Sequence, residues 1–322
     1  MKNTFEEFGR IRAKSGAGDN YITNINEIET DGFGPTLNIV WLYPDIMCLH
    51  GGRGDMMALL RVATLMNISV KITRVNSLRE KIPFEWADLI LLGSGDMKCV
   101  PDIVEALKAQ MGGDAGVQPG ADASADAPAD SLLGFIAKGG TFLAIGSSGA
   151  ALGRDYDLTD GSRHTGLEIL GMDMKYRDLV YGDDVWMHVL ETSSATAESP
   201  LGGVEIVGNQ IMVADVTLLD GQEPFAKVKY GRGNCGDGVE GARVGNVIYT
   251  SCVGPALVKN PRLAEALLVN AIEATGAYGS GDDAGAAGSG AKTIHYDPLK
   301  DADIEVELQA LEELKNFINS KI

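Results

Sequence analysis

The chain has 322 residues, of which 27 are basic and 45 acidic, and its formal net charge at pH 7 is −18. Such a charge repels phosphate backbones and anionic lipid surfaces, which argues against nucleic-acid and membrane partners. The longest apolar runs, such as residues 89–92, have the length of a strand and fall far short of a membrane span.

The first 36 residues contain no continuous apolar segment of the kind that a secretory signal requires. We therefore expect residues 1–36 to form a lead-in to a cytoplasmic protein. The four cysteines lie far apart and include no Cys-x-x-Cys pair, which argues against a disulfide framework and against a zinc site. We expect reduced thiols, no metal and no cofactor.

Short apolar runs and helical patterns follow one another after the lead-in. Residues 37–42 predict a buried strand that stops before Pro44, and Asp55 is placed to cap a helix with apolar residues at helical spacing. Further strands are expected at residues 68–72 and 87–92. This order of elements indicates a parallel sheet whose strands are joined by crossovers.

The next part of the chain contains a compositional break. Residues 103–111 predict a helix, but residues 112–131 consist almost entirely of Gly, Ala, Asp and Pro. So few large apolar groups cannot offset the entropy cost of ordering, which predicts a disordered insertion. A helix over residues 132–138 and a strand over residues 141–145 follow, and the strand ends abruptly at the glycine- and serine-rich turn 146–149.

The second half of the chain is richer in β patterns. Alternating segments within residues 166–253 predict a second layer of strands in the same domain. Residues 261–275 predict an amphipathic helix, and residues 279–292 a flexible linker. The last segment, 293–322, carries a helical apolar stripe over residues 301–322, which we expect to dock on the domain or on a partner.

The turn after the strand at residues 141–145 has the pattern of a nucleophile elbow. A sharp turn between strand and helix exposes one side chain, and the amides that begin the helix favour a developing negative charge. A strand–helix junction that uses glycine only for close packing would give the same pattern. The turn alone therefore does not decide between a catalytic and a structural role.

Four segments occur in an order and at a spacing that are typical of one enzyme family. They are residues 43–55, which contain Pro44-Asp45 and a glycine cluster; residues 91–96, Leu-Leu-Gly-Ser-Gly-Asp; the elbow together with residues 166–171, Gly-Leu-Glu-Ile-Leu-Gly; and residues 246–255, which end in Gly254-Pro255. Together they resemble the CobB/CobQ-like branch of the class I glutamine amidotransferases. The nearest resemblance is to the glutaminase subunit (GatD) of lipid II isoglutaminyl synthase.

The resemblance runs from residue 37 to about residue 276. It implies a three-layer, flavodoxin-like α/β domain of the class I glutamine amidotransferase type over residues 37–278, with a mostly parallel central sheet. It also implies a ligand pocket after the third strand, and the residues expected to form it are Gly93, Ser94, Gly95, Asp96 and Arg53.

The resemblance departs from the family at the catalytic positions. Family members attack the side-chain amide of glutamine with a cysteine at the elbow, use a histidine before Gly-Pro as the base, and pass ammonia to a ligase. Here the nucleophile position is Gly146 and the base position is Val253, and neither residue forms a thiolate or moves a proton. The resemblance thus implies a subunit without glutaminase activity. Its expected partner is a Mur-ligase-like (MurT-type) synthetase of peptidoglycan precursor amidation, with glutamine or another small molecule in the pocket.

Other functions stay open on the sequence. An active amidohydrolase or amidotransferase would use Ser147, Ser148 or Cys99, and Ser148 nearly fits Gly-x-Ser-x-Gly. A serine nucleophile needs a base. The histidines of the chain are His50, His164, His188 and His295. A cobyric-acid-synthase-type relative of cobalamin biosynthesis shares the motifs, and a small-molecule sensor would use the vacated pocket.

Two further patterns are interpreted as structural. Asp155, Asp157 and Asp160 alternate like metal ligands, but they lack the glycine and the distal glutamate of a calcium loop, which predicts a solvated loop. The glycine-rich residues 231–238 match no phosphate or calcium motif and predict a long hairpin connection. Cys252, next to Val253 in a strand, is expected to point into the core.

Overall fold

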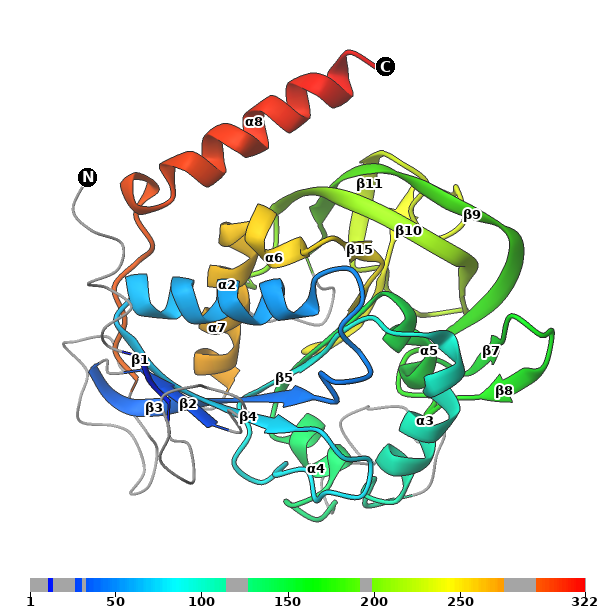
Figure 1. The fold of residues 1–322 in the computed structure, drawn as a ribbon, viewed down its shortest axis with the longest axis horizontal. Coiled ribbons are helices and arrows are strands. Elements are labelled where there is room, and N and C mark those ends of the chain that lie inside the picture. Colours follow the sequence, from blue (N-terminus) through cyan, green and yellow to red (C-terminus); the bar gives the residue numbers. More distant parts are fainter. Residues whose placement is uncertain are drawn as a thin grey trace.

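The computed structural model describes residues 11–13, 27–30, 33–113, 127–191, 199–274 and 294–321. Parallel strands form the middle of a central sheet, namely β3 (Phe33–Leu42), β4 (Ile68–Val75), β5 (Leu89–Leu92), β6 (Thr141–Ile145) and β14 (Val247–Thr250). Antiparallel strands extend its edges, namely β1 (Ile11–Ala13), β2 (Glu27–Thr30) and β13 (Ala242–Val244). The order across the sheet is β1-β2-β4-β3-β5-β6-β14-β13 (Figure 1).

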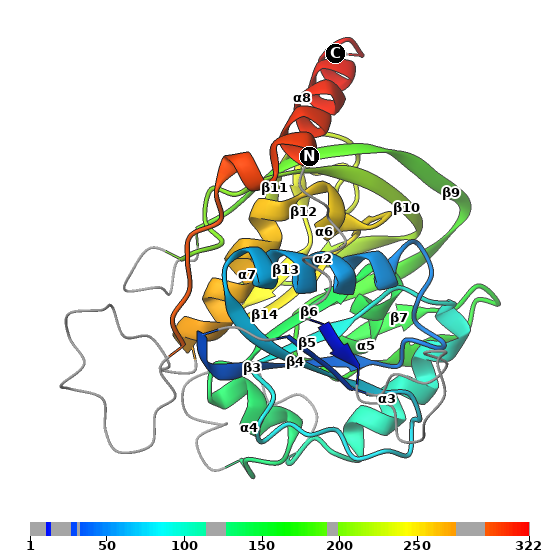
Figure 2. The same cartoon turned by 60° about the vertical axis from the view of Figure 1, so that its left-hand side comes forward.

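Helices cover both faces of this sheet (Figures 1 and 2). One face carries α2 (Gly52–Leu65), α6 (Ala256–Lys259) and α7 (Pro261–Ala274), and the other carries α3 (Val100–Lys108), α4 (Leu132–Ala137) and α5 (Gly149–Leu152). Successive residues of a strand point to opposite faces, so Ile39 and Trp41 pack toward α2 and α7, whereas Val40 and Leu42 pack toward α3 and α4. The predicted three-layer α/β architecture with a mostly parallel sheet is confirmed.

Several element boundaries differ from the sequence predictions. β3 begins at Phe33 rather than at residue 37, and β1 and β2 join the sheet from within the expected lead-in. α2 begins at Gly52, which leaves Asp55 inside its first turn instead of at the cap. α3 begins at Val100 rather than at residue 103, because Pro101 fits a first helical turn that has no use for its missing N–H.

The expected insertion is only partly described. Residues 114–126 and the whole of the expected linker 279–292 lie outside the described residues. At the end of the insertion the prediction of disorder is wrong, because Ser131 caps α4. Its Oγ accepts a hydrogen bond from Gly134 N at 3.2 Å and donates one to Pro128 O at 2.5 Å.

A second, mostly antiparallel sheet stands at the carboxyl end of the central strands. It contains β9 (Met172–Val189), β10 (Glu205–Leu218), β11 (Ala226–Tyr230), β12 (Val239–Glu240) and β15 (Cys252–Val253) in the order β12-β11-β9-β10-β15. The chain crosses from the central sheet to this one at Ser251, between β14 and β15. The predicted second layer of strands is present as this sheet, and residues 231–238 form the predicted connection between β11 and β12.

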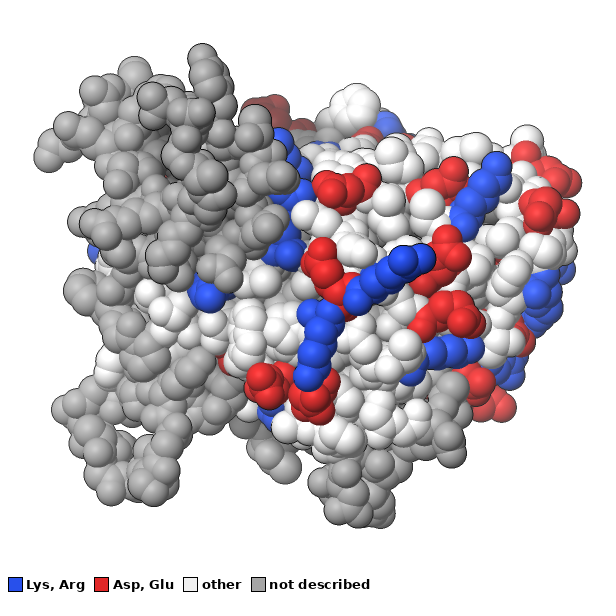
Figure 3. Space-filling model, turned by 60° about the horizontal axis from the view of Figure 1, so that its bottom comes forward, with Lys and Arg blue, Asp and Glu red and all other residues white. Residues whose placement is uncertain are grey.

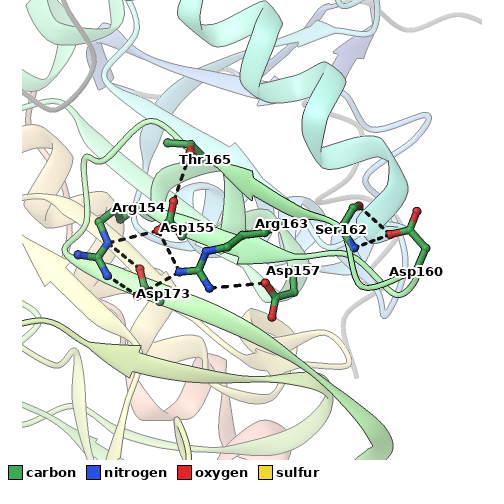
Figure 4. Close-up of polar contacts among 8 residues, drawn as sticks. All are labelled: Arg154, Asp155, Asp157, Asp160, Ser162, Arg163, Thr165 and Asp173. Carbon is green, nitrogen blue, oxygen red and sulfur yellow. Dashed lines mark hydrogen bonds and ion pairs between the residues drawn. The ribbon is translucent and has the colours of Figure 1, made fainter.

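A small hairpin replaces the loop predicted around Asp155, Asp157 and Asp160. Strands β7 (Asp155–Asp157) and β8 (Arg163–Thr165) pair antiparallel. Figure 4 shows Arg154 and Arg163 among these carboxylates, and Arg163 Nη2 lies 3.0 Å from Asp155 Oδ2. The hydrogen bond from Arg163 lowers the pKa of Asp155. The solvated-loop prediction is therefore wrong for Asp155 and Asp157, because arginines pair with the acidic side chains.

The last described helix, α8 (Glu305–Asn319), lies against the outer side of the second sheet and projects at one end of the molecule (Figure 2). Ile318 packs with Trp186 and Val207, and Lys315 Nζ lies 2.6 Å from Glu205 Oε2. The helix begins at Glu305 rather than at residue 301. Only part of the predicted apolar stripe docks on the domain, through Leu311, Leu314 and Ile318, whereas Val306 and Phe317 are 75% and 55% exposed.

Charge is dispersed over the face that Figure 3 shows, where Lys and Arg side chains lie among Asp and Glu instead of gathering into one patch. Every helix among the described residues is too short or too polar to span a bilayer. In the same part of the chain, no group of His, Cys, Asp and Glu side chains is arranged to hold a metal ion.

Candidate functional site

A cavity of about 280 Å³ lies where the carboxyl ends of the central strands meet the second sheet. In open α/β sheets this edge is the usual place for a ligand. The segments that follow β5 and β6 contribute Ser94, Gly95, Asp96, Gly146 and Ser147 to the lining. Strand β10 forms the opposite wall with Ile211, Met212, Val213, Ala214 and Val216. The cavity therefore lies between the predicted elbow and a strand of the second sheet.

The two positions that correspond to the family's nucleophile and base are neighbours in space. Gly146 has φ +64°, in the left-handed region that side chains rarely adopt. A Cβ built on Gly146 would lie 3.4 Å from Val253 Cγ1, and only 2.6 Å from Ser94 Oγ and 2.8 Å from Ser94 Cβ. Ser94 thus occupies the space that a side chain at Gly146 would need.

Ser148, the serine that nearly fits the elbow motif, has no exposed surface. Its hydroxyl donates to two carbonyl oxygens, Leu92 O at 3.0 Å and Ile145 O at 2.9 Å. It is absent from the cavity lining. The hydroxyl ties the elbow to the ends of β5 and β6 and is held away from any substrate in the cavity.

Ser147 does reach the cavity, but backbone groups occupy its hydroxyl. Oγ accepts a hydrogen bond from Gly95 N at 2.8 Å, donates one to Gly95 O at 2.8 Å, and lies 3.3 Å from Ser94 Oγ. His50 lines the same cavity. In the described part of the chain, however, no histidine lies within hydrogen-bonding distance of the Ser147 hydroxyl. The serine–histidine contact that the structure does contain, Ser162 Oγ to His164 Nε2 at 2.9 Å, lies in the β7–β8 hairpin.

We expect Ser148→Ala to lower the free energy of unfolding by about 1–2 kcal/mol, because the change removes two hydrogen bonds from a fully buried hydroxyl. The matched change Ser320→Ala, on an exposed serine, is expected to stay within about 0.5 kcal/mol. Urea unfolding followed by tryptophan fluorescence measures both. Equal stability of the two variants would contradict a structural role for Ser148.

The two cysteines nearest the motifs are poorly placed for catalysis. Cys99 is half-buried, packs against the core cluster on the α3 side of the sheet, and is not part of the cavity lining. Cys252 is fully buried, as predicted, and burial raises the pKa of its thiol, with a further rise from nearby Glu240. Burial thus keeps Cys252 in its unreactive thiol form.

The pocket residues expected from the resemblance separate into two groups. Ser94, Gly95 and Asp96 line the cavity, but Gly93 and Arg53 do not. Gly93 is buried against the loop after β3, where a Cβ would lie 2.5 Å from Met47 O. Arg53 is exposed on α2. Among the described residues, the cavity lining therefore includes no arginine or lysine to bind a carboxylate.

A buried carboxyl group stands directly behind the cavity floor. Glu240, with no exposed surface, accepts hydrogen bonds from Ser251 N at 2.6 Å, Ser251 Oγ at 2.8 Å and Thr250 Oγ1 at 3.0 Å. Ser251 lines the cavity and also accepts a hydrogen bond from Gln210 Nε2 at 2.6 Å. Burial raises the pKa of Glu240 to about 7 against the opposing effect of these donors.

A second buried carboxyl group connects two helices. Asp55 Oδ1 accepts a hydrogen bond from Leu257 N, in the first turn of α6, at 2.7 Å. Burial raises the pKa of Asp55 to about 7, although the backbone N–H groups of Leu257 and Ala256 act in the opposite direction. Asp55 thus fixes the segment that follows Gly254-Pro255 to α2, the helix after the first motif loop.

Much of the cavity has no signal in the sequence. The apolar wall of β10 was predicted only as a strand, because its part in a site depends on the second sheet folding over the elbow. Glu240 and Gln210 gave no signal, since each stands alone among apolar or glycine-rich neighbours. His50 lay within a motif loop, but its place in the cavity follows from the turn after β3, where its φ is +59°.

Comparison with known proteins gives structural likenesses only. No protein-family model and no curated protein matches the chain. PurLQS of Thermotoga maritima is similar over 74% of this chain and 99% of its own, with 13% identity and a TM-score of 0.46. A glutamine amidotransferase of the same organism is similar over 74% of this chain and 84% of its own, with 10% identity and a TM-score of 0.38. A ThuA-like protein of Bacteroides uniformis is similar over 80% of this chain and 95% of its own, with 11% identity and a TM-score of 0.40.

Proposed function

We propose that this chain is a glutamine amidotransferase-like subunit that has no glutaminase activity and acts with a Mur-ligase-like synthetase in the amidation of a cell-wall precursor. The observation that carries the proposal is the crowding at Gly146, where Ser94 and Val253 lie close to the place that a side chain would take. A Cβ at Gly146 would meet Ser94 within 2.8 Å, and Val253 lies where the family has its base. The elbow thus lacks both a nucleophile and the room for one.

The order of the four motif segments supports the rest of the proposal. All four segments reach one cavity. Its lining includes Leu49 and His50, Ser94 to Met97, Gly146 and Ser147, and Ser251. A subunit with this arrangement but no hydrolytic pair would contribute binding, and the synthetase would take ammonia from solution.

Co-purification and an amidation assay with a MurT-type synthetase test this function. We expect the two chains to elute together in size exclusion, and the complex to amidate lipid II with ammonium chloride but not with glutamine. Separate elution would contradict the partner. Amidation driven by glutamine, abolished by Ser147→Ala, would contradict the loss of activity.

One observation favours a second candidate, a serine amidohydrolase. Ser147 and His50 line the same cavity, and this enzyme would require a movement of the loop after β3 that brings the imidazole to the hydroxyl. This enzyme would lose all hydrolysis on His50→Ala as well as on Ser147→Ala. The non-hydrolytic subunit would show the same background rate in both variants.

A further inference from the structure

The cavity has an unusually thioether-rich wall for a site that resembles a glutamine pocket. Met97, Met174 and Met212 line it from three different segments, the turn after β5, strand β9 and strand β10. Ile211 and Val213 extend the same apolar surface. Methionine side chains adapt to the shape of a ligand, and their sulfur atoms make favourable contacts with aromatic rings. This wall fits a flat apolar group better than the polar chain of glutamine.

Two polar residues of the cavity, Asp96 and Ser251, offer acceptors to a ligand. Asp96 is exposed, and its Oδ1 accepts a hydrogen bond from Lys98 N at 3.0 Å. At the floor, Ser251 Oγ already donates to Glu240 and keeps a lone pair for a ligand donor. Lys98 follows the lining residues Asp96 and Met97 in sequence, but it does not line the cavity.

The charges of the lining therefore favour one sign of ligand charge over the other. In the described part of the chain, the lining contains a carboxylate at Asp96 and no lysine or arginine, so a ligand carboxylate would exchange its hydration for hydroxyl and imidazole donors, such as Ser94 and His50, without the charge of a lysine or arginine. A ligand ammonium group would gain an ion-pair partner at Asp96. The net charge of −18 adds a long-range attraction for cations. A volume of about 280 Å³ has room for a single ring with a short chain.

We propose that this cavity binds a small organic cation, with one aromatic ring against Met97, Met174 and Met212 and an ammonium group at Asp96. The inference concerns the ligand of the cavity and holds whether or not the chain acts with a synthetase. Glutamine is a poor fit, because its α-carboxylate would face no cation in the lining.

The test compares probes that share a ring and differ in charge. Phenethylamine is the cation, 2-phenylethanol the neutral probe and 3-phenylpropanoate the anion, each titrated into the full chain at pH 8 and low salt. Saturation-transfer NMR detects binding, and calorimetry gives the dissociation constants. We expect phenethylamine to bind about tenfold more tightly than 2-phenylethanol, and 3-phenylpropanoate to bind most weakly.

Two variant pairs tie this preference to the cavity. Asp96→Asn should reduce the preference for the cation to about twofold or less, whereas Asp102→Asn, which removes the same charge from an exposed site on α3, should leave it about tenfold. Ile211→Lys places a cation in the lining at a residue that is 44% exposed and should favour 3-phenylpropanoate. Leu179→Lys, at an exposed residue of β9 outside the lining, should leave the order of probes unchanged.

Four results would overturn the proposal. They are equal binding of phenethylamine and 2-phenylethanol, equal effects of Asp96→Asn and Asp102→Asn, tighter binding of L-glutamine than of any ring probe, and no binding of any probe at millimolar concentration. None of these results bears on whether a synthetase co-elutes with the chain, so the partner and the ligand are tested separately.

Discussion

Gly146→Cys, which introduces the residue type that class I glutamine amidotransferases use at the elbow, is expected to lower the free energy of unfolding by about 2–4 kcal/mol and to produce no glutaminase activity. Two costs add at this residue. A side chain at φ +64° is strained, and its Cβ would meet Ser94 Oγ at 2.6 Å. Activity stays absent because Val253 accepts no proton from the new thiol. Urea unfolding and an ammonia assay measure the two effects.

Two glycines of the same chain separate these costs. Gly161 has φ +83° with no atom within 4 Å of a built Cβ, so Gly161→Cys reports the backbone strain alone, about 1 kcal/mol. Gly182 has open space and no positive φ, so Gly182→Cys is expected to change stability by less than about 0.5 kcal/mol. Gly146→Cys with the stability of Gly182→Cys would contradict the crowding at the elbow.

The contact with Ser94 is tested by a double-mutant cycle. Gly146→Cys should cost about 1–2 kcal/mol less in a Ser94→Gly background, because glycine removes both the Oγ and the Cβ that crowd the new side chain. If the free-energy costs of Gly146→Cys and Ser94→Gly simply add, the obstruction at Gly146 is not Ser94.

The free energy of unfolding is expected to fall as the pH rises toward about 7, owing to two buried carboxyl groups. The pKa values of Asp55 and Glu240 are raised to about 7 in the folded protein from ordinary values of 3.8 and 4.5. A carboxyl group with a raised folded pKa stabilises the fold while it is protonated. Its contribution is complete below the unfolded pKa and is lost as the pH rises through the folded one. Across this window Asp55 contributes about 4 kcal/mol and Glu240 about 3 kcal/mol.

Neutral isosteres isolate this effect. Glu240→Gln keeps an acceptor for Ser251 N and should remove about half of the decline between pH 5 and pH 7, and Asp55→Asn should remove the other half. Glu105→Gln, on an exposed residue of α3, is the matched control and should follow the wild-type curve. Urea titrations at pH 5, 6, 7 and 8 give the slopes. A Glu240→Gln variant with the wild-type slope would show that Glu240 is charged in the folded protein throughout.

The sequence predicted the layers of the fold well, because they depend on local periodicity. The short apolar run within β3 and the apolar spacing of α2 were readable from neighbouring residues. The hairpin of β7 and β8 was not, since its stability depends on Arg154 and Arg163, which pair with carboxylates across the turn and on β9. Local patterns lack this information because it concerns pairs of distant residues.

The site was predictable in its position but not in its chemistry. The motif segments located the elbow, and Gly146 and Val253 proved to be spatial neighbours. The methionine wall and the Glu240 network arise from the second sheet, whose register on the elbow has no local signature. Ser148 looked like a nucleophile because spacing alone does not tell whether a hydroxyl faces a cavity or a buried carbonyl oxygen.

Ammonia release from L-glutamine by the wild-type chain, with and without a MurT-type synthetase, tests the proposed absence of glutaminase activity most directly. We predict a rate equal to that of the buffer in both samples, because a missing nucleophile and base cost on the order of a millionfold. Turnover above that rate, abolished by Ser147→Ala or Cys99→Ala and unaffected by Ser320→Ala, would contradict the proposed absence of glutaminase activity.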